Sequence, residues 1–236
     1  MKTFTSIIVL GLIGFGIWWW GVRSEVVPVA EEPEQIKLCF YSEDESPDSN
    51  FEDKYTLRIN LEGEKASGEL KLLPAEKDAL VGKFEGTAKF TDEFGIGREA
   101  DLIWNTEGEG MTAKQELKIK FGEGGASVAF GEMVLREDGV YGYKDSTNLN
   151  YSQVIPATEC DWLNEREAVE KYLWGNIATL SPIAPVLGGN WYVVNATIDL
   201  ENNSGTVIYE DGHIQEKRDF TYVQSASGAV ESLTIE

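Results

Sequence analysis

The stretch Tyr55-Thr56-Leu57-Arg58-Ile59-Asn60-Leu61 places apolar side chains at its odd-numbered positions and polar side chains at its even-numbered ones. Successive side chains of a β-strand point to opposite faces, so this alternation predicts a strand with one buried and one solvated face. Glu62-Gly63-Glu64 follows directly and has the composition of a tight turn. The stretch therefore indicates an antiparallel β structure.

The same alternation recurs along the chain, in runs around Phe84–Phe90, Leu102–Trp104 and Leu117–Phe121. Glycine-rich turns separate these runs, and together they predict about seven or eight antiparallel strands between residues 36 and 161. A closed barrel and a two-sheet sandwich both fit that strand number. Glycines inside predicted strands favour the barrel, because closure requires sharp bends; these are Gly68, Gly86 and Gly131.

Residues 162–236 predict a small α+β domain. Asn164 and Glu167 have the spacing of a capping box, with Asp161 as the alternative N-cap, and apolar residues follow at helical spacing until Pro182. Four strands are expected after Gly188-Gly189, joined by hairpin turns, at 191–200, 205–210, 214–223 and 229–235. The fold class is thus mainly β, with one helix packed on a four-stranded antiparallel meander after the barrel-like domain.

The first 23 residues predict a transmembrane anchor. No charged residue occurs from Thr3 to Val22, and twenty helical residues span about 30 Å, the thickness of the bilayer hydrocarbon. Lys2 marks the cytoplasmic side, so the body of the chain is expected outside the cytoplasm. Apolar and interfacial positions of this anchor include Ile7, Leu10, Ile13, Trp18, Trp19 and Trp20.

The alternative to the anchor is a cleaved signal peptide, for which Pro28-Val29-Ala30 offers the first small-residue site and which would leave a secreted protein. Residues 24–35 contain two prolines and four acidic residues, and they predict an extended acidic linker. Both alternatives place residues 36–236 outside the cytoplasm.

Cys39 and Cys160 are the two cysteines of the chain, and they bracket the predicted barrel-like domain. In an oxidising compartment such a pair predicts one disulfide, while two buried thiols are the alternative. The chain contains no CxxC motif and its single histidine is His213, so a zinc site is not expected.

Charge restricts the choice of partners. The formal net charge is −21, and because residues 1–23 carry two positive charges, the remainder carries −23. Nucleic acid is therefore not expected as a partner, since phosphate binding needs clustered cations. The run from Glu43 to Asp53 is rich in carboxylates and is a candidate for a low-affinity divalent-cation loop, with a solvated loop as the alternative.

The barrel-like domain resembles the calycin or lipocalin class in strand number and in closure by a disulfide, which implies a small apolar ligand. The helix followed by a meander resembles the cystatin-like and NTF2-like folds. Two phrases, LPAEKD…GKFEG…FGEM…DGVYGYKD (Leu73 through Asp145) and VLGG-x-WYVV…YEDGHIQ (Val186 through Gln215), resemble a group of bacterial envelope-anchored proteins that has no assigned activity.

No catalytic or cofactor-binding residue can be named from the sequence. The expected function is that of a membrane-anchored, non-enzymatic module that binds a small ligand or another component of the envelope. The alternatives are a hydrolase of envelope polymers that uses paired carboxylates, and a structural assembly subunit. With 41 acidic residues some pair always has the spacing of a hydrolase, so composition does not decide between them.

Overall fold

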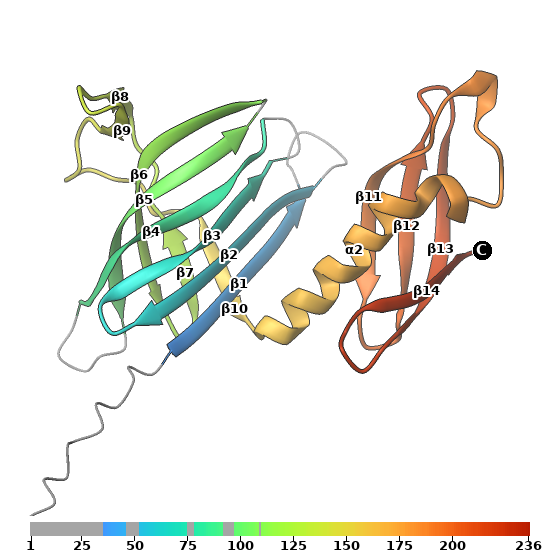
Figure 1. Ribbon diagram of the computed structural model, residues 1–236, viewed down its shortest axis with the longest axis horizontal. Coiled ribbons are helices and arrows are strands. Elements are labelled where there is room, and N and C mark those ends of the chain that lie inside the picture. Colours follow the sequence, from blue (N-terminus) through green and yellow to red (C-terminus); the bar gives the residue numbers. More distant parts are fainter. Residues whose placement is uncertain (1–34, 46–51, 75–77, 92–96, 109) are drawn as a thin grey trace, which may run out of the picture. The chain divides into compact units, whose positions relative to one another are not determined.

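The computed structural model describes residues 35–45, 52–74, 78–91, 97–108 and 110–236 (Figure 1). The chain divides into two units, residues 1–34 and 35–236, and the second unit is described below. The expected membrane anchor and most of the expected linker lie outside the described residues. Within the described part, no helix combines the length and the apolar character needed to cross a membrane.

Eight antiparallel strands form a closed barrel, because β5 pairs with β6 at the seam of the sheet. This confirms the barrel rather than the sandwich. In spatial order the strands are β5 (Arg98–Gly108), β4 (Leu80–Phe90), β3 (Lys65–Leu73), β2 (Glu52–Glu62), β1 (Gln35–Glu45), β10 (Val154–Thr158), β7 (Gly125–Val128) and β6 (Met111–Gly122).

A short hairpin extends the sheet beyond β6. It consists of β8 (Met133–Leu135) and β9 (Val140–Tyr143), and β9 runs parallel to the start of β6. β8 is the last strand of the sheet order. Figure 1 shows this hairpin at the end of the barrel opposite to the start of β1.

Apolar side chains fill the interior of the barrel, as expected for eight strands. They come from alternate positions of the strands, including Leu57, Ile59, Leu70, Ile119 and Ile155. Two of the glycines that suggested closure lie where neighbouring strands approach closely. A Cβ atom at Gly68 would lie 1.8 Å from the Arg58 carbonyl oxygen, and one at Gly86 would lie 2.2 Å from that of Asp101.

The third of those glycines, Gly131, lies outside the strands. The prediction that Gly131 lies inside a strand was therefore wrong, although the closed barrel is confirmed.

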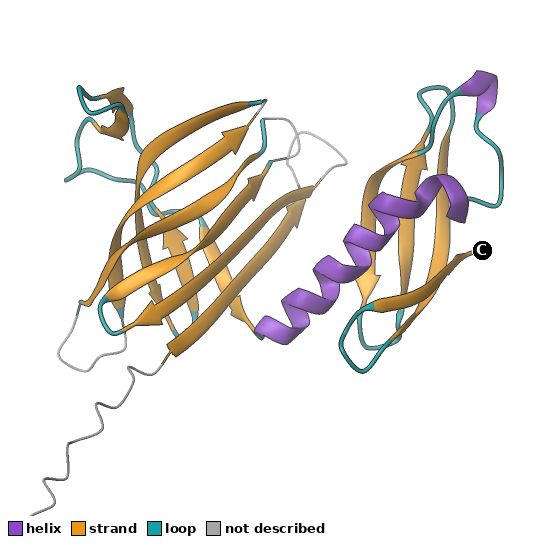
Figure 2. Cartoon of the chain, viewed as in Figure 1, coloured by secondary structure: helices purple, strands orange, loops and turns teal. Residues whose placement is uncertain are grey.

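A long helix and a second sheet follow the barrel (Figure 2). The helix is α2 (Cys160–Leu180), a 3-10 turn η1 (Val186–Gly188) comes next, and the sheet has the order β11-β12-β13-β14. Val169, Leu173 and Ile177 of α2 pack in the core of this sheet. The predicted helix and four-stranded meander are confirmed, with strands β11 (Tyr192–Asp199), β12 (Ser204–Glu210), β13 (Gln215–Gln224) and β14 (Val230–Ile235).

The predicted start of the helix was wrong. α2 begins at Cys160, and its N-cap residue Glu159 makes no side-chain capping bond. Asn164 and Glu167 therefore lie inside the helix, where both bind Arg58 of β2 instead of forming a capping box. The expected boundary between residues 161 and 162 falls within the first turn of α2.

Candidate functional site

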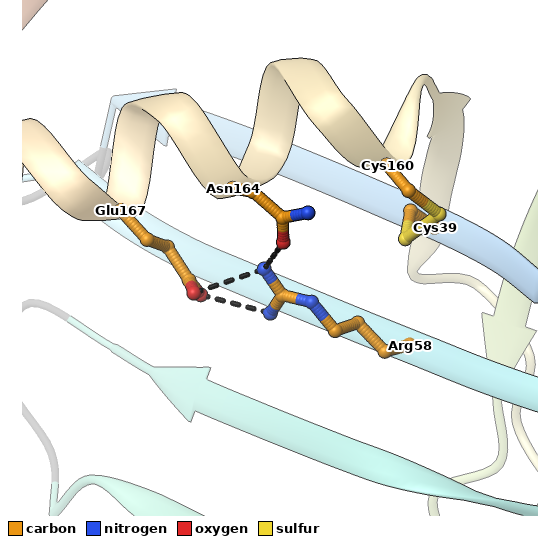
Figure 3. Close-up of a disulfide and its surroundings, with 5 residues drawn as sticks. All are labelled: Cys39, Arg58, Cys160, Asn164 and Glu167. Carbon is orange, nitrogen blue, oxygen red and sulfur yellow. Dashed lines mark hydrogen bonds and ion pairs between the residues drawn. A yellow bond between two sulfur atoms is a disulfide. The ribbon is translucent and has the colours of Figure 1, made fainter. Parts of the chain in front are cut away.

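A disulfide joins the first residue of α2 to the barrel. Cys39 of β1 and Cys160 are bonded, with their Cα atoms 5.2 Å apart (Figure 3). Cys39 lies opposite Thr158 of β10 in the sheet, so the bond holds the helix where the barrel strand ends. The predicted disulfide is confirmed.

Arg58 on the outer face of β2 forms the first ionic contact with α2. Its guanidinium donates to both carboxylate oxygens of Glu167 at 2.9 Å, and to the Asn164 side-chain oxygen at 3.2 Å (Figure 3). Lys71 of β3 reaches the same carboxylate at 2.9 Å. Burial raises the pKa of Glu167, but the hydrogen bonds from Arg58 and Lys71 outweigh burial, and the net shift is downward.

Arg166 forms the second ionic contact, and its side chain is only 4% exposed. It pairs with Glu43 of β1, and it lies 3.6 Å from Glu170 one turn later. Lys54 of β2 pairs with Glu43 at 2.8 Å. The Arg166 guanidinium also lies over the Tyr41 ring, whose centroid is 4.8 Å away. Each charged group named in this contact therefore has a neighbour of opposite charge, as a buried ion cluster requires.

The disulfide and the two ionic contacts act on one half of α2, and the apolar core of the second sheet holds the other half. Charged side chains of α2 at 166 and 167 face the barrel, whereas Leu173 and Ile177 face the second sheet. α2 is thus a shared element of both sheets. One disulfide and two ionic contacts therefore oppose the release of α2 from the barrel.

A groove of about 620 Å³ lies at the end of the barrel that carries the β8–β9 hairpin. The tip of the β5–β6 hairpin forms one wall, and the β8–β9 hairpin forms the other. The volume lies in the range of small-molecule sites. Its lining includes Thr106, Met111, Ala113, Lys114, Gln115, Met133 and Tyr141.

Apolar side chains are unusually exposed around this groove. Met111 and Tyr141 line the groove and are 69% and 41% exposed, and Leu135 of β8 is 62% exposed. Leu135 lies directly opposite Tyr141 in the β8–β9 ladder, so the two side chains share a face. Exposed apolar side chains at a groove are a feature of interaction sites.

Comparison of the chain with protein-family models, with curated proteins and with solved structures found no significant match. The functional argument therefore depends on the geometry of the chain itself.

The carboxylate-rich run from Glu43 to Asp53 is described only at its ends. Glu43 is paired with Lys54 and Arg166, so its carboxylate serves the contact with α2. Residues 46–51 lie outside the described part, and the cation loop stays a prediction. Elsewhere in the described chain, no group of three or more His, Cys, Asp or Glu residues is arranged to hold a metal ion.

Sequence reasoning missed both the ionic contacts and the groove. No sequence motif marks Arg58, Arg166 or Glu167. The ion pairs that they form depend on which face of the strands α2 covers. Met111 and Leu135 gave no signal either, because in the sequence alone an apolar residue is an ordinary candidate for the core.

Proposed function

We propose that this chain is a non-enzymatic binding module that acts outside the cytoplasm, carried there by its N-terminal segment, and that it binds through the groove between the β5–β6 and β8–β9 hairpins. The observation that carries the proposal is a groove large enough for a ligand, with the exposed apolar side chains of Met111 and Tyr141 in its lining. The ligand is a small molecule or a segment of another envelope component. The disulfide agrees with an oxidising location.

The barrel interior supports this choice of site. An eight-stranded barrel is either filled by side chains or holds one small ligand. Here Leu57, Leu70 and Ile119 are among the completely buried side chains that fill it. The groove at the barrel end therefore suits a ligand better than the interior that the resemblance to calycins implied.

We favour binding over the hydrolase because Glu107 is the one carboxylate among the described residues that line the groove, whereas a glycosidase uses a pair. A glycosidase-type pair needs one carboxyl whose pKa is raised, so that it can donate a proton. The pKa values of Asp145, Glu167, Asp199 and Asp211 are instead all lowered, in each case with hydrogen bonds to the ionised form among the causes. These four groups are acceptors rather than proton donors.

Native mass spectrometry of the full-length chain, extracted from its own source in mild detergent, tests the proposal. We expect a retained adduct that is lost in Met111→Asp, because the new carboxylate is placed in the apolar rim. Leu187→Asp is the matched control, since Leu187 is 85% exposed and lies on η1 in the other part of the chain. Absence of any adduct, or equal retention by Met111→Asp, would contradict the proposal.

A further inference from the structure

β8 is an edge strand of the sheet, and its first residue, Met133, lines the groove. β8 pairs with β9 along one side, and it ends the sheet order on the other. A strand at a sheet edge presents unpaired N–H and C=O groups, to which an extended chain can add. Which residues of β8 could pair with an added strand therefore depends on which of its backbone N–H and C=O groups point away from β9.

The hydrogen bonds of the hairpin identify those groups. The Arg136 N–H donates to the Val140 carbonyl at 3.0 Å, and the Lys144 N–H donates to the Glu132 carbonyl at 2.8 Å. In an antiparallel ladder successive residues direct their backbone groups to opposite sides. The backbone N–H and C=O groups of residues 132, 134 and 136 thus point toward β9, and those of Met133 and Leu135 point to the free edge.

β8 is a short edge strand of three residues, but it lacks the other features that block strand addition. Proteins protect free edges with charged residues, proline, bulges or a covering segment. β8 is Met-Val-Leu, without charge or proline. No backbone hydrogen bond from elsewhere in the described chain reaches Met133 or Leu135. Leu135 and Val134 are exposed on opposite faces, so an added strand would find apolar contacts on both.

The charges near the edge indicate which strand it accepts. Glu132 pairs with Lys144 at 2.8 Å, and Arg136 pairs with Glu116 at 2.6 Å. Glu107 lies on the groove wall, and Glu137 and Asp138 lie in the turn between β8 and β9. None of these three carboxylates has an ion pair within the described part of the chain. Lys114 is the cation that lines the groove. Carboxylates therefore outnumber cations around the free edge, in a chain whose net charge is −21.

We infer that the partner is an extended polypeptide segment that pairs with β8, places apolar side chains in the groove and carries Lys or Arg residues opposite these carboxylates. The inference rests on the proposed function and specifies its partner. A second copy of this chain is a poorer occupant, because both copies would bring a large negative charge to the contact.

The test uses the full-length chain with the peptide acetyl-Lys-Val-Lys-Val-Lys-Val-Lys-amide as the probe, followed by amide hydrogen exchange. We expect the Met133 and Leu135 amides to exchange rapidly in the free chain and slowly with peptide present. The Val134 and Arg136 amides, which face β9, should change little. A peptide with Glu in place of Lys should give no protection at the same concentration.

Two variants keep the test sharp. Leu135→Pro removes the outward N–H and should abolish protection. Leu135→Lys keeps the backbone but adds a like charge, and it should weaken peptide binding about tenfold. Leu187→Lys is the control and should bind as the parent chain does. Protection at another strand, or none at millimolar peptide, overturns the inference.

The outcomes separate this inference from the function on which it rests. If the peptide fails but native mass spectrometry finds an adduct that Met111→Asp loses, the groove binds a different ligand and the β8 inference alone is wrong. If both measurements are negative, the binding function fails as well.

Discussion

Removing the disulfide gives the most quantitative prediction for this chain. Cys39 and Cys160 are 121 residues apart, and a crosslink of that span restricts the unfolded chain by about 5 kcal/mol in the loop-entropy model. We expect the double variant Cys39→Ser/Cys160→Ser to keep the fold, because the contacts of Arg58 and Arg166 still hold α2. Its barrel should unfold about 10–20 °C lower, at roughly 2–4 °C per kcal/mol for a chain of this size.

Two buried tryptophans allow the effect to be located. Trp104 is in the barrel core, and Trp191 is in the core of the second sheet. With 5-fluorotryptophan incorporated, ¹⁹F NMR during a thermal or urea titration follows each indole separately. The closed loop contains the barrel strands but not residues 162–236, so the Trp104 transition should shift much more than that of Trp191. A loss below about 1 kcal/mol at Trp104, or equal shifts at both positions, would refute this reasoning.

Three further predictions concern α2 and the second sheet. Because the pKa of Glu167 is lowered in the folded chain, its contribution to stability is complete above its ordinary pKa of 4.5 and is lost as the pH falls through the folded value. Glu167→Gln should therefore flatten the pH dependence of the free energy of unfolding in urea below about pH 4.5. An unchanged slope would contradict this. Arg166→Ala should cost about 1.5–3 kcal/mol in chemical denaturation, because it removes charged hydrogen bonds from the partly buried carboxylates of Glu43 and Glu170. Lys144→Ala, at an exposed pair, should cost less than about 1 kcal/mol, and equal costs would contradict the burial of Arg166. Gly175→Ala, in an open position of α2, should stabilise the chain by about 1 kcal/mol, because alanine has the higher helix propensity. Gly205→Ala should destabilise the chain, because its Cβ would lie 2.3 Å from the Thr197 carbonyl oxygen. Thermal unfolding of both variants checks these opposite signs.

Local patterns predicted much of the fold. The alternation at Tyr55–Leu61 reports directly which face of a strand is buried, and β2 indeed contributes Leu57, Ile59 and Leu61 to the barrel core. The glycines at 68 and 86 lie within barrel strands as predicted, but what requires them there is the close approach of the neighbouring strand, with which a side chain would collide. The disulfide followed from compartment and spacing.

The start of α2 could not be predicted from the local sequence. Asn164 and Glu167 have the letters of a capping box, but the disulfide at Cys160 and the contacts with Arg58 extend the helix by one turn. Tertiary contacts outweighed a capping preference of about 1 kcal/mol.

The groove could not be predicted because it depends on a pairing between distant segments. Lys114 of β6 lies opposite Val140 of β9 in a parallel ladder, and nothing in either segment signals that pairing. Met111 of the groove lining and Leu135 of β8 are both exposed. In the sequence alone, each residue is an ordinary candidate for the core.

The central claim is that the chain binds its partner through the groove and the β8 edge, and site-specific photo-crosslinking in the native source tests it most directly. A benzophenone side chain placed at Met111 should give a covalent adduct with the bound molecule, whereas one placed at Leu187 should give none. Adducts from position 187 with none from position 111 would contradict the account.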